Sequence, residues 1–118
     1  MQAKAYRDLI VWQRAMDLVV DVYRLSSGFP RQELYGLTGQ VRRAAVSIPS
    51  NLAEGQGRGK GNEFLHYVRI AQGSLQEVET QLLIAQRLCY LDASALDPVL
   101  SLADEVGRLN RGLHKSLA

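Results

Sequence analysis

The 118-residue sequence has a single cysteine, Cys89, and no long run of apolar residues. One cysteine cannot form an intrachain disulfide, so we expect a protein of a reducing compartment. The apolar runs are far shorter than the ~20 residues that a membrane-spanning helix needs. The first residues, MQAKAYRDLIVW, also lack the apolar region and small-residue cleavage site of a signal peptide. We therefore expect a soluble, cytoplasmic protein without a membrane anchor.

The sequence also has little net charge, +2 at pH 7, and few aromatic residues, 7%. A surplus this small does not indicate nucleic-acid binding by itself, so the position of the charges matters. The aromatic residues do not alternate with basic ones, which disfavours recognition of single strands on an aromatic platform. The hydrophobic content of 47% is that of an ordinary globular protein, and the length suits one domain, residues 1–118.

Apolar residues recur at spacings of three and four and almost never alternate, which predicts helices and no strand. Four segments show this pattern, and the short connections between them favour antiparallel neighbours. The sequence therefore predicts an all-α fold, an antiparallel up-down-up-down four-helix bundle. The expected N-caps are Asp8, Thr38, Gly61 or Asn62, and Asp97, the last followed by Pro98 as the first helical residue. The expected core positions include Val11, Ala15, Leu18, Val22, Leu25, Val41, Ala45, Ile48, Leu52, Val68, Ala71, Leu75, Val78, Leu82, Ala85, Val99, Leu102, Val106, Leu109, Leu113 and Leu117.

Pro49 lies within the predicted second helix, where it removes the hydrogen bond to the carbonyl of Ala45 and crowds that turn. The apolar positions continue across the proline, from Ile48 to Leu52. We therefore expect one helix with a proline kink and not two separate helices. Neighbouring polar side chains can bond the freed backbone groups: Ser47, Ser50 and Asn51.

Four glycines alternate with other residues in GQGRGKG, residues 55–61, and are expected to end the second helix. Their spacing does not match a P-loop, which needs four residues between its first glycine and a Gly-Lys pair followed by Ser or Thr. It does not match the dinucleotide-binding fingerprint either, because no strand precedes it. A flexible connection between helices is the simpler interpretation, in which Arg58 and Lys60 can still contact phosphates.

The remaining chemical motifs are incomplete. Glu63 and His66 form one E-x-x-H, but a di-iron bundle needs a second such motif and two further carboxylates, so we expect no metal. Cys89 lies on the apolar positions of the third helix, which predicts a buried structural thiol and not a nucleophile. The two histidines, His66 and His114, do not combine with a serine and an aspartate into a triad. The sequence therefore predicts no catalytic residue, no cofactor and no enzyme.

The predicted topology brings separated segments to one end of the bundle: the start of the first helix, the loop after the second and the end of the fourth. Six basic and three acidic residues lie there, a surplus of positive charge that could meet phosphates. Alternatively, the same residues only complement helix termini and form pairs such as Glu54–Arg58. Two further arginines add positive charge on the second helix. The candidate nucleic-acid-binding residues are Lys4, Arg7, Arg42, Arg43, Arg58, Lys60, Arg111 and Lys115.

Apolar residues exceed what the core of a small bundle can bury. Near the end of the third helix, residues 82–91 are apolar around most of the circumference, which indicates burial on more than one side. The first helix has further apolar residues outside its core positions: Trp12, Val19, Val20 and Tyr23. We therefore expect a homo-oligomer.

Two segments of the sequence resemble one known family. GLTGQVRRAAVSIPSNLAEGQGR (Gly36–Arg58) and EFLHYVRIAQGSLQEVETQLLIA (Glu63–Ala85) are similar to the four-helix-bundle proteins encoded in intervening sequences of 23S ribosomal RNA genes. The resemblance begins near Tyr6, at YRDLIVWQRAMDL, and continues to the C-terminus. Its most specific part is SIPSNLAEG, because a proline within a helix flanked by small polar residues is uncommon. A more distant similarity in fold is to the accessory protein of diversity-generating retroelements.

The resemblance implies a bundle with a kinked second helix, a barrel-like homopentameric assembly and binding of nucleic acid through a basic surface. It also implies no catalytic activity, since none is accepted for the family. No binding residue is carried over from the family, so the candidate residues above depend on the topology alone. This chain is less basic than we expect of the retroelement relative.

Two functions are therefore in competition. In the first, a homo-oligomer, pentameric by resemblance, binds structured RNA or other nucleic acid through its basic end. In the second, the chain is a self-assembling structural module or binds a protein partner, and its basic residues serve helix termini. Nucleic-acid affinity that falls as salt is added would favour the first.

Overall fold

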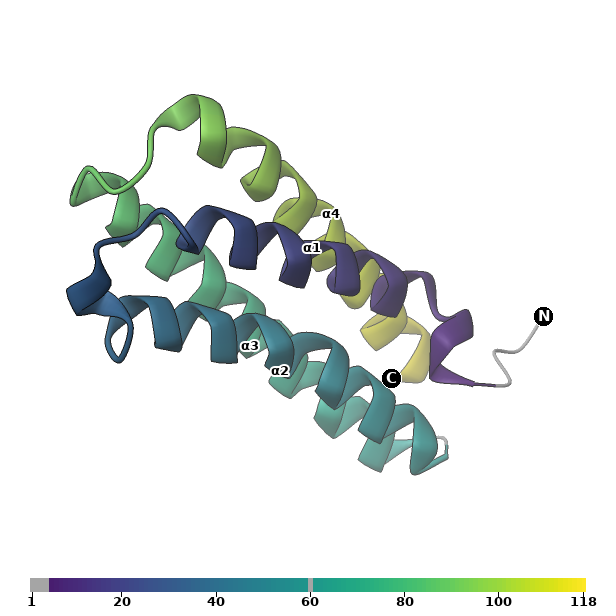
Figure 1. The fold of residues 1–118 in the computed structure, drawn as a ribbon. Coiled ribbons are helices and arrows are strands. Elements are labelled where there is room, and N and C mark those ends of the chain that lie inside the picture. Colours follow the sequence, from purple (N-terminus) through teal and green to yellow (C-terminus); the bar gives the residue numbers. More distant parts are fainter. Residues whose placement is uncertain (1–4, 60) are drawn as a thin grey trace.

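The computed structural model describes residues 5–59 and 61–118 and forms a four-helix bundle of 43 × 25 × 20 Å. The helices are α1 (Ile10–Ser26), α2 (Leu37–Gly57), α3 (Asn62–Arg87) and α4 (Ala93–Leu117). Short 3-10 turns, η1 (Tyr6–Asp8) and η2 (Arg31–Glu33), precede α1 and α2. These described residues include no strand. In Figure 1 the chain passes back and forth along the long axis, each helix running opposite to the one before.

The core contains the residues that the helical spacing predicts. Most of the expected core positions are less than 10% exposed, whereas Leu25, Leu109, Leu113 and Leu117 are only partly buried and pack against the edge of the core. Burial of apolar surface contributes about 25 cal/mol for each Å² removed from water, so these positions supply most of the driving force for the bundle. The helix α2 packs most extensively on α3, and α1 and α4 complete the core.

Three of the predicted N-caps are wrong. Asp8 lies in η1, and the N-cap of α1 is Leu9. Thr38 is buried inside α2, because the carboxylate of Glu33 accepts the N–H of Leu37 at 3.1 Å and so caps the helix from outside.

The fourth helix also begins earlier than Asp97. The carboxylate of Asp92 accepts the N–H of Ala95 at 3.0 Å, which makes Asp92 the N-cap of α4 and places Pro98 within the helix. The earlier start brings Leu96, which is completely buried, onto the core face one turn before Val99. At the start of α3, the predicted alternative Gly61 is the N-cap.

Pro49 is buried within α2, which continues through it to Gly57. This agrees with one helix and not two, while the kink itself stays a prediction. The amide of Asn51 donates to the carbonyl of Ser47 at 2.8 Å and to the Ser47 hydroxyl at 2.9 Å. The Ser47 hydroxyl in turn lies 2.8 Å from that of Ser74, so the polar residues beside the proline also join α2 to α3.

The end of α3 differs from the prediction for Cys89, which is exposed and not a buried thiol. Its φ of 63° lies in the left-handed region, which ends the helix. The N–H of Cys89 donates to the carbonyl of Gln86, and the N–H of Tyr90 donates to that of Ala85, both at 2.9 Å. These two bonds form a Schellman motif, which turns the cysteine side chain away from the core positions that precede it.

No helix within the described residues has the length and apolar character needed to cross a bilayer.

Candidate nucleic-acid interface

One end of the bundle collects segments that are far apart in the sequence. Figure 1 shows the start of α1, the α2–α3 connection and the C-terminus at this end, which we call the basic end. The described candidates on these segments are Arg7 in η1, Arg58 just after α2, and Arg111 and Lys115 in α4. Lys4 and Lys60 lie outside the described residues. All four described cations are exposed to solvent.

Arg58 is partly neutralised by its neighbours. Its Nη2 donates to Oε2 of Glu54 at 3.0 Å, and the hydroxyl of Tyr67 donates to the same oxygen at 3.2 Å. The guanidinium also lies 5.5 Å from the centre of the Tyr67 ring. The hydrogen bond to Glu54 raises the pKa of Arg58. The predicted Glu54–Arg58 pair is therefore present, and Arg58 has less free charge to offer a phosphate than the sequence alone indicates.

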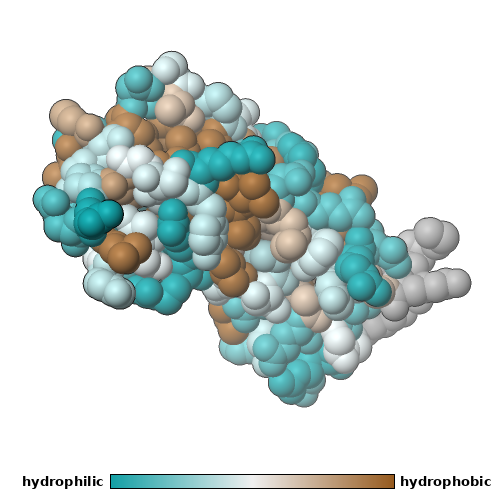
Figure 2. All heavy atoms as spheres, in the orientation of Figure 1, coloured by the Kyte–Doolittle hydropathy of each residue, from teal (hydrophilic) through white to brown (hydrophobic). Residues whose placement is uncertain are grey.

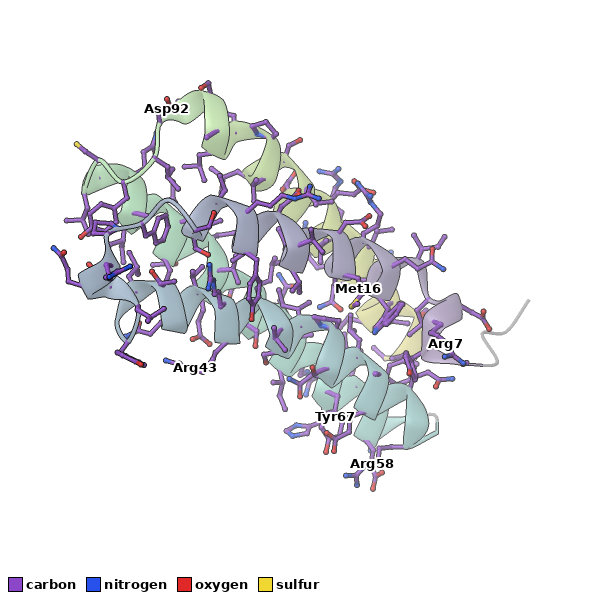
Figure 3. All side chains as sticks on the ribbon, viewed as in Figure 1. Arg7, Met16, Arg43, Arg58, Tyr67 and Asp92 are labelled. Carbon is purple, nitrogen blue, oxygen red and sulfur yellow. The ribbon has the colours of Figure 1, made fainter. Side chains whose placement is uncertain are left out.

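Arg7 and the cations near the end of α4 are not held by an acidic side chain as Arg58 is. The guanidinium of Arg7 lies over the ring of Tyr6, 5.6 Å from its centre, and Figure 3 shows it at the same end as Arg58. Within the described chain, no ion pair within 4.0 Å involves Arg7, Arg111 or Lys115. Among the described residues, Arg7 and Lys115 therefore supply positive charge without an acidic partner, while Glu79 partly offsets the charge of Arg111.

Arg42 and Arg43 do not belong to the basic end. Nε of Arg42 donates to the hydroxyl of Ser26 at 2.8 Å, and its guanidinium lies 4.6 Å from the centre of the Tyr23 ring. Arg42 therefore links α2 to the end of α1, and its guanidinium is already occupied by contacts within the bundle. Figure 3 places Arg43 in the opposite half of the bundle from Arg7 and Arg58.

A groove between α3 and α4 opens beside the basic end and has a volume of about 440 Å³. Arg69 and Gln72 line it from α3, and Arg111 and His114 line it from α4. Nε of Arg69 donates to Nε2 of His114 at 3.3 Å, which joins the two helices across the groove. No acidic residue is among the described residues that line it.

The floor of the groove includes Val68 and Asn110, both less than 5% exposed. The amide nitrogen of Asn110 donates to the carbonyl of Val68 and to Oε1 of Gln72, both at 3.1 Å. Its Oδ1 is buried and has no hydrogen-bond partner among the described residues. The amide is therefore held in one orientation by two acceptors, with an acceptor of its own left unsatisfied.

Arg111 lies back along α4 towards the groove. A Cβ added to Gly107 would stand 3.2 Å from Nη1 of Arg111 and 3.3 Å from Cδ2 of Leu75. The observed position of the Arg111 guanidinium therefore requires a glycine at position 107. Arg111 also affects the pKa of Glu79 on α3. Burial raises the pKa of Glu79 and the nearby Asp104 raises it further, while Arg111 lowers it.

The sequence interpretation missed Arg69 and the Asn110–Gln72 pair, and it considered His114 only as a member of a catalytic triad. A signal was present: Arg69, Gln72 and Gln76 are spaced by three and four, directly beside the core positions of the third helix. Within the described residues, no three His, Cys, Asp or Glu side chains lie close enough together to hold a metal ion.

Comparisons with known proteins identify relatives by sequence and by fold. The family model described as 23S rRNA-intervening sequence protein matches residues 7–112. A crystal structure of a protein of unknown function from the S23 ribosomal protein family of Bacteroides thetaiotaomicron is similar in fold, with a TM-score of 0.82 and 20% identity. The similarity covers 90% of this chain and 99% of that chain. The comparison with curated proteins found no match.

Proposed function

The chain belongs to the 23S rRNA-intervening sequence protein family, and we propose that it is a non-enzymatic, homo-oligomeric protein that binds structured RNA or other nucleic acid through its basic end. The observation that carries this proposal is the gathering of Arg7, Arg111 and Lys115, from both ends of the chain, near one end of the bundle, with no ion pair within 4.0 Å to any of them among the described residues. We further propose that the protein acts in the cytoplasm.

The recognition would be of shape and phosphate position more than of sequence. Guanidinium groups bind phosphate oxygens in a fork geometry, and such contacts supply affinity without reading bases. We therefore expect binding to a folded backbone with little sequence preference.

Exposed apolar side chains support the homo-oligomeric part of the proposal. Met16, Val20 and Tyr23 of α1 and Val46 of α2 are each 40–47% exposed. Figure 2 shows a brown band across the middle of the face that α1 and α2 form. A second set lies at the end of α3: Leu83, Ile84 and Leu88. Two apolar surfaces on one chain suit a closed ring in which each subunit contacts two neighbours.

We propose a homopentamer, the stoichiometry that the resemblance implies. Cyclic symmetry places all basic ends at the same side of a ring, so a modest surplus of charge in each subunit becomes a strong field in the assembly. Light scattering on the purified protein measures the mass directly, and a monomer across the concentration range would contradict this part.

The test of nucleic-acid binding is a gel-shift titration of a folded RNA at several salt concentrations, with two triple variants. Replacing Arg7, Arg111 and Lys115 by glutamine should weaken binding and reduce the dependence of log K on log salt by about two to three units. The matched control replaces three exposed arginines elsewhere by glutamine: Arg24, Arg31 and Arg87. Equal losses of affinity in both variants, or a wild-type affinity that does not change with salt concentration, would overturn the proposal.

The second candidate is a self-assembling or protein-interaction module without nucleic-acid binding. The exposed apolar faces favour it, because they explain assembly whether or not the basic end has a ligand. An oligomer that shows no gel shift even at low salt would favour this function over the first.

A further inference from the structure

The groove between α3 and α4 has an open floor beneath a cationic rim. Contacts with the phosphate backbone of a nucleic acid would occupy only the rim. A Cβ added to Gly73, which lines the groove, would have no atom within 4 Å, so the groove is open beside this residue. The volume of about 440 Å³ lies within the range of small-molecule sites.

The rim of the groove is cationic on both walls. Arg69 is held from α3 by His114, and Arg111 leans back over Gly107 from α4. Neither arginine has an ion pair within 4.0 Å among the described residues. Two guanidinium groups can bind one phosphate, and their planes can also stack on a nucleobase.

Amide groups below the rim can bond a base edge. Because Oε1 of Gln72 accepts from Asn110, the N–H groups of Gln72 remain as donors. The Oδ1 of Asn110 is buried and has no partner in the described chain, while the amide nitrogen of Asn110 fixes the orientation of the Gln72 amide.

We propose that the α3–α4 groove binds a single unpaired nucleotide of the bound nucleic acid, with its phosphate between Arg69 and Arg111 and its base over Gly73. This inference deepens the proposed function and depends on it. A nucleotide fits because it has both a phosphate for the rim and a base for the floor. An inorganic anion would leave the open floor and the amides unused. A purely apolar ligand would leave the two guanidinium groups unused.

The direct test is NMR titration of the ¹⁵N-labelled full chain with AMP, with adenosine and inorganic phosphate as matched ligands. The side-chain amide signals of Gln72 and Asn110 should shift with AMP at lower concentrations than with either part alone. Gly73→Leu should abolish these shifts by filling the floor. Gly112→Leu, another added side chain in open space but outside the groove, should retain them.

Three results of this titration would overturn the inference. They are amide signals that AMP leaves unmoved, shifts that persist in Gly73→Leu, and phosphate alone acting as strongly as AMP. Because leucine favours helix more than glycine does, Gly73→Leu should fold, and circular dichroism checks that it does.

A second test uses two RNA hairpins of equal length, one fully paired and one with a single-nucleotide bulge. Wild type should prefer the bulged hairpin by about tenfold, the scale of stacking one base. Gly73→Leu should lose that preference and keep its affinity for the paired hairpin. Equal binding of both hairpins by wild type would overturn the inference and leave the proposed function standing. Binding of AMP without binding of either hairpin would defeat both as stated and leave a free-nucleotide site.

Discussion

Gly55 of α2 lies directly against Tyr67 of α3: a Cβ added to the glycine would stand 2.6 Å from the Cβ of the tyrosine. The same added atom would stand 3.1 Å from Cδ1 of Phe64. The close approach holds Tyr67 where its hydroxyl and ring meet Glu54 and Arg58. A glycine that the sequence assigned to the end of a helix is thus a buried contact within it.

Replacing Gly55 by alanine should destabilise the bundle by about 1–3 kcal/mol, because the added methyl group forces α2 and α3 apart. The helix-forming preference of alanine offsets only part of this cost. Urea unfolding followed by circular dichroism measures the free energy. Gly73→Ala is the control, since it adds the same methyl group within α3 in open space and should stabilise by about 0.5–1 kcal/mol. If Gly55→Ala stabilised as much, the close contact would not exist.

The buried side of each helix could be predicted from the sequence because it follows from periodicity alone. Val41, Ala45, Ile48 and Leu52 continue the spacing across Pro49, and all four are buried. Gly55 belongs to the same buried face, one turn after Leu52, but a glycine has no apolar side chain to reveal it.

The start of α2 was harder to predict, because the residue that caps it also contacts a side chain far away in the chain. Glu33 caps α2 from outside the helix while also accepting the hydroxyl of Tyr90 at 2.8 Å. The N–H of Leu37 and the hydroxyl of Tyr90 both lower the pKa of Glu33. Tyr90 is 57 residues away from Glu33 along the chain, so no local pattern indicates the contact.

The groove on the flank of the basic end was beyond sequence reasoning for a similar reason. Its two cationic walls come from different helices, Arg69 from α3 and Arg111 from α4. Their juxtaposition depends on the rotation of each helix about its axis and on Gly107, which makes room for Arg111. Topology predicted which end each residue lies near, but not that a groove separates α3 from α4 there.

Cys89 stands at a position that usually belongs to glycine. In the left-handed region an L-residue with a Cβ is disfavoured by about 1–2 kcal/mol, and φ at Cys89 is 63°. Cys89→Gly should therefore stabilise the protein by about 0.5–1 kcal/mol after the greater freedom of glycine in the unfolded chain is included.

The control for Cys89→Gly is Cys89→Ala, which removes the exposed thiol but keeps the Cβ in the same conformation. Its stability should stay within about 0.5 kcal/mol of wild type. Guanidinium unfolding under reducing conditions compares the three proteins. Equal stabilisation by alanine and glycine would show that the thiol, and not the backbone, is responsible.

Glu79 makes the stability of the bundle depend on pH. Burial raises its pKa and Asp104 raises it further, against the lowering effect of Arg111. Between the unfolded value near 4.5 and the raised folded value, the folded state binds more protons than the unfolded state. Stability from this group therefore falls as pH rises through that window, and above it the penalty is complete.

Glu79→Gln should thus be more stable than wild type at pH 7, and the difference should shrink as pH falls towards 4.5. Arg111→Gln should have the opposite effect at pH 7, because it removes the cation that offsets the half-buried carboxylate of Glu79. Urea unfolding at several pH values measures both, with Glu77→Gln as the control for losing one negative charge from α3. A Glu79→Gln profile that matches the Glu77→Gln profile would contradict the prediction. Arg111 also lines the groove, where we propose that it binds a phosphate. A bound phosphate would compete with Glu79 for the guanidinium, so AMP should raise the pKa of Glu79 further in wild type.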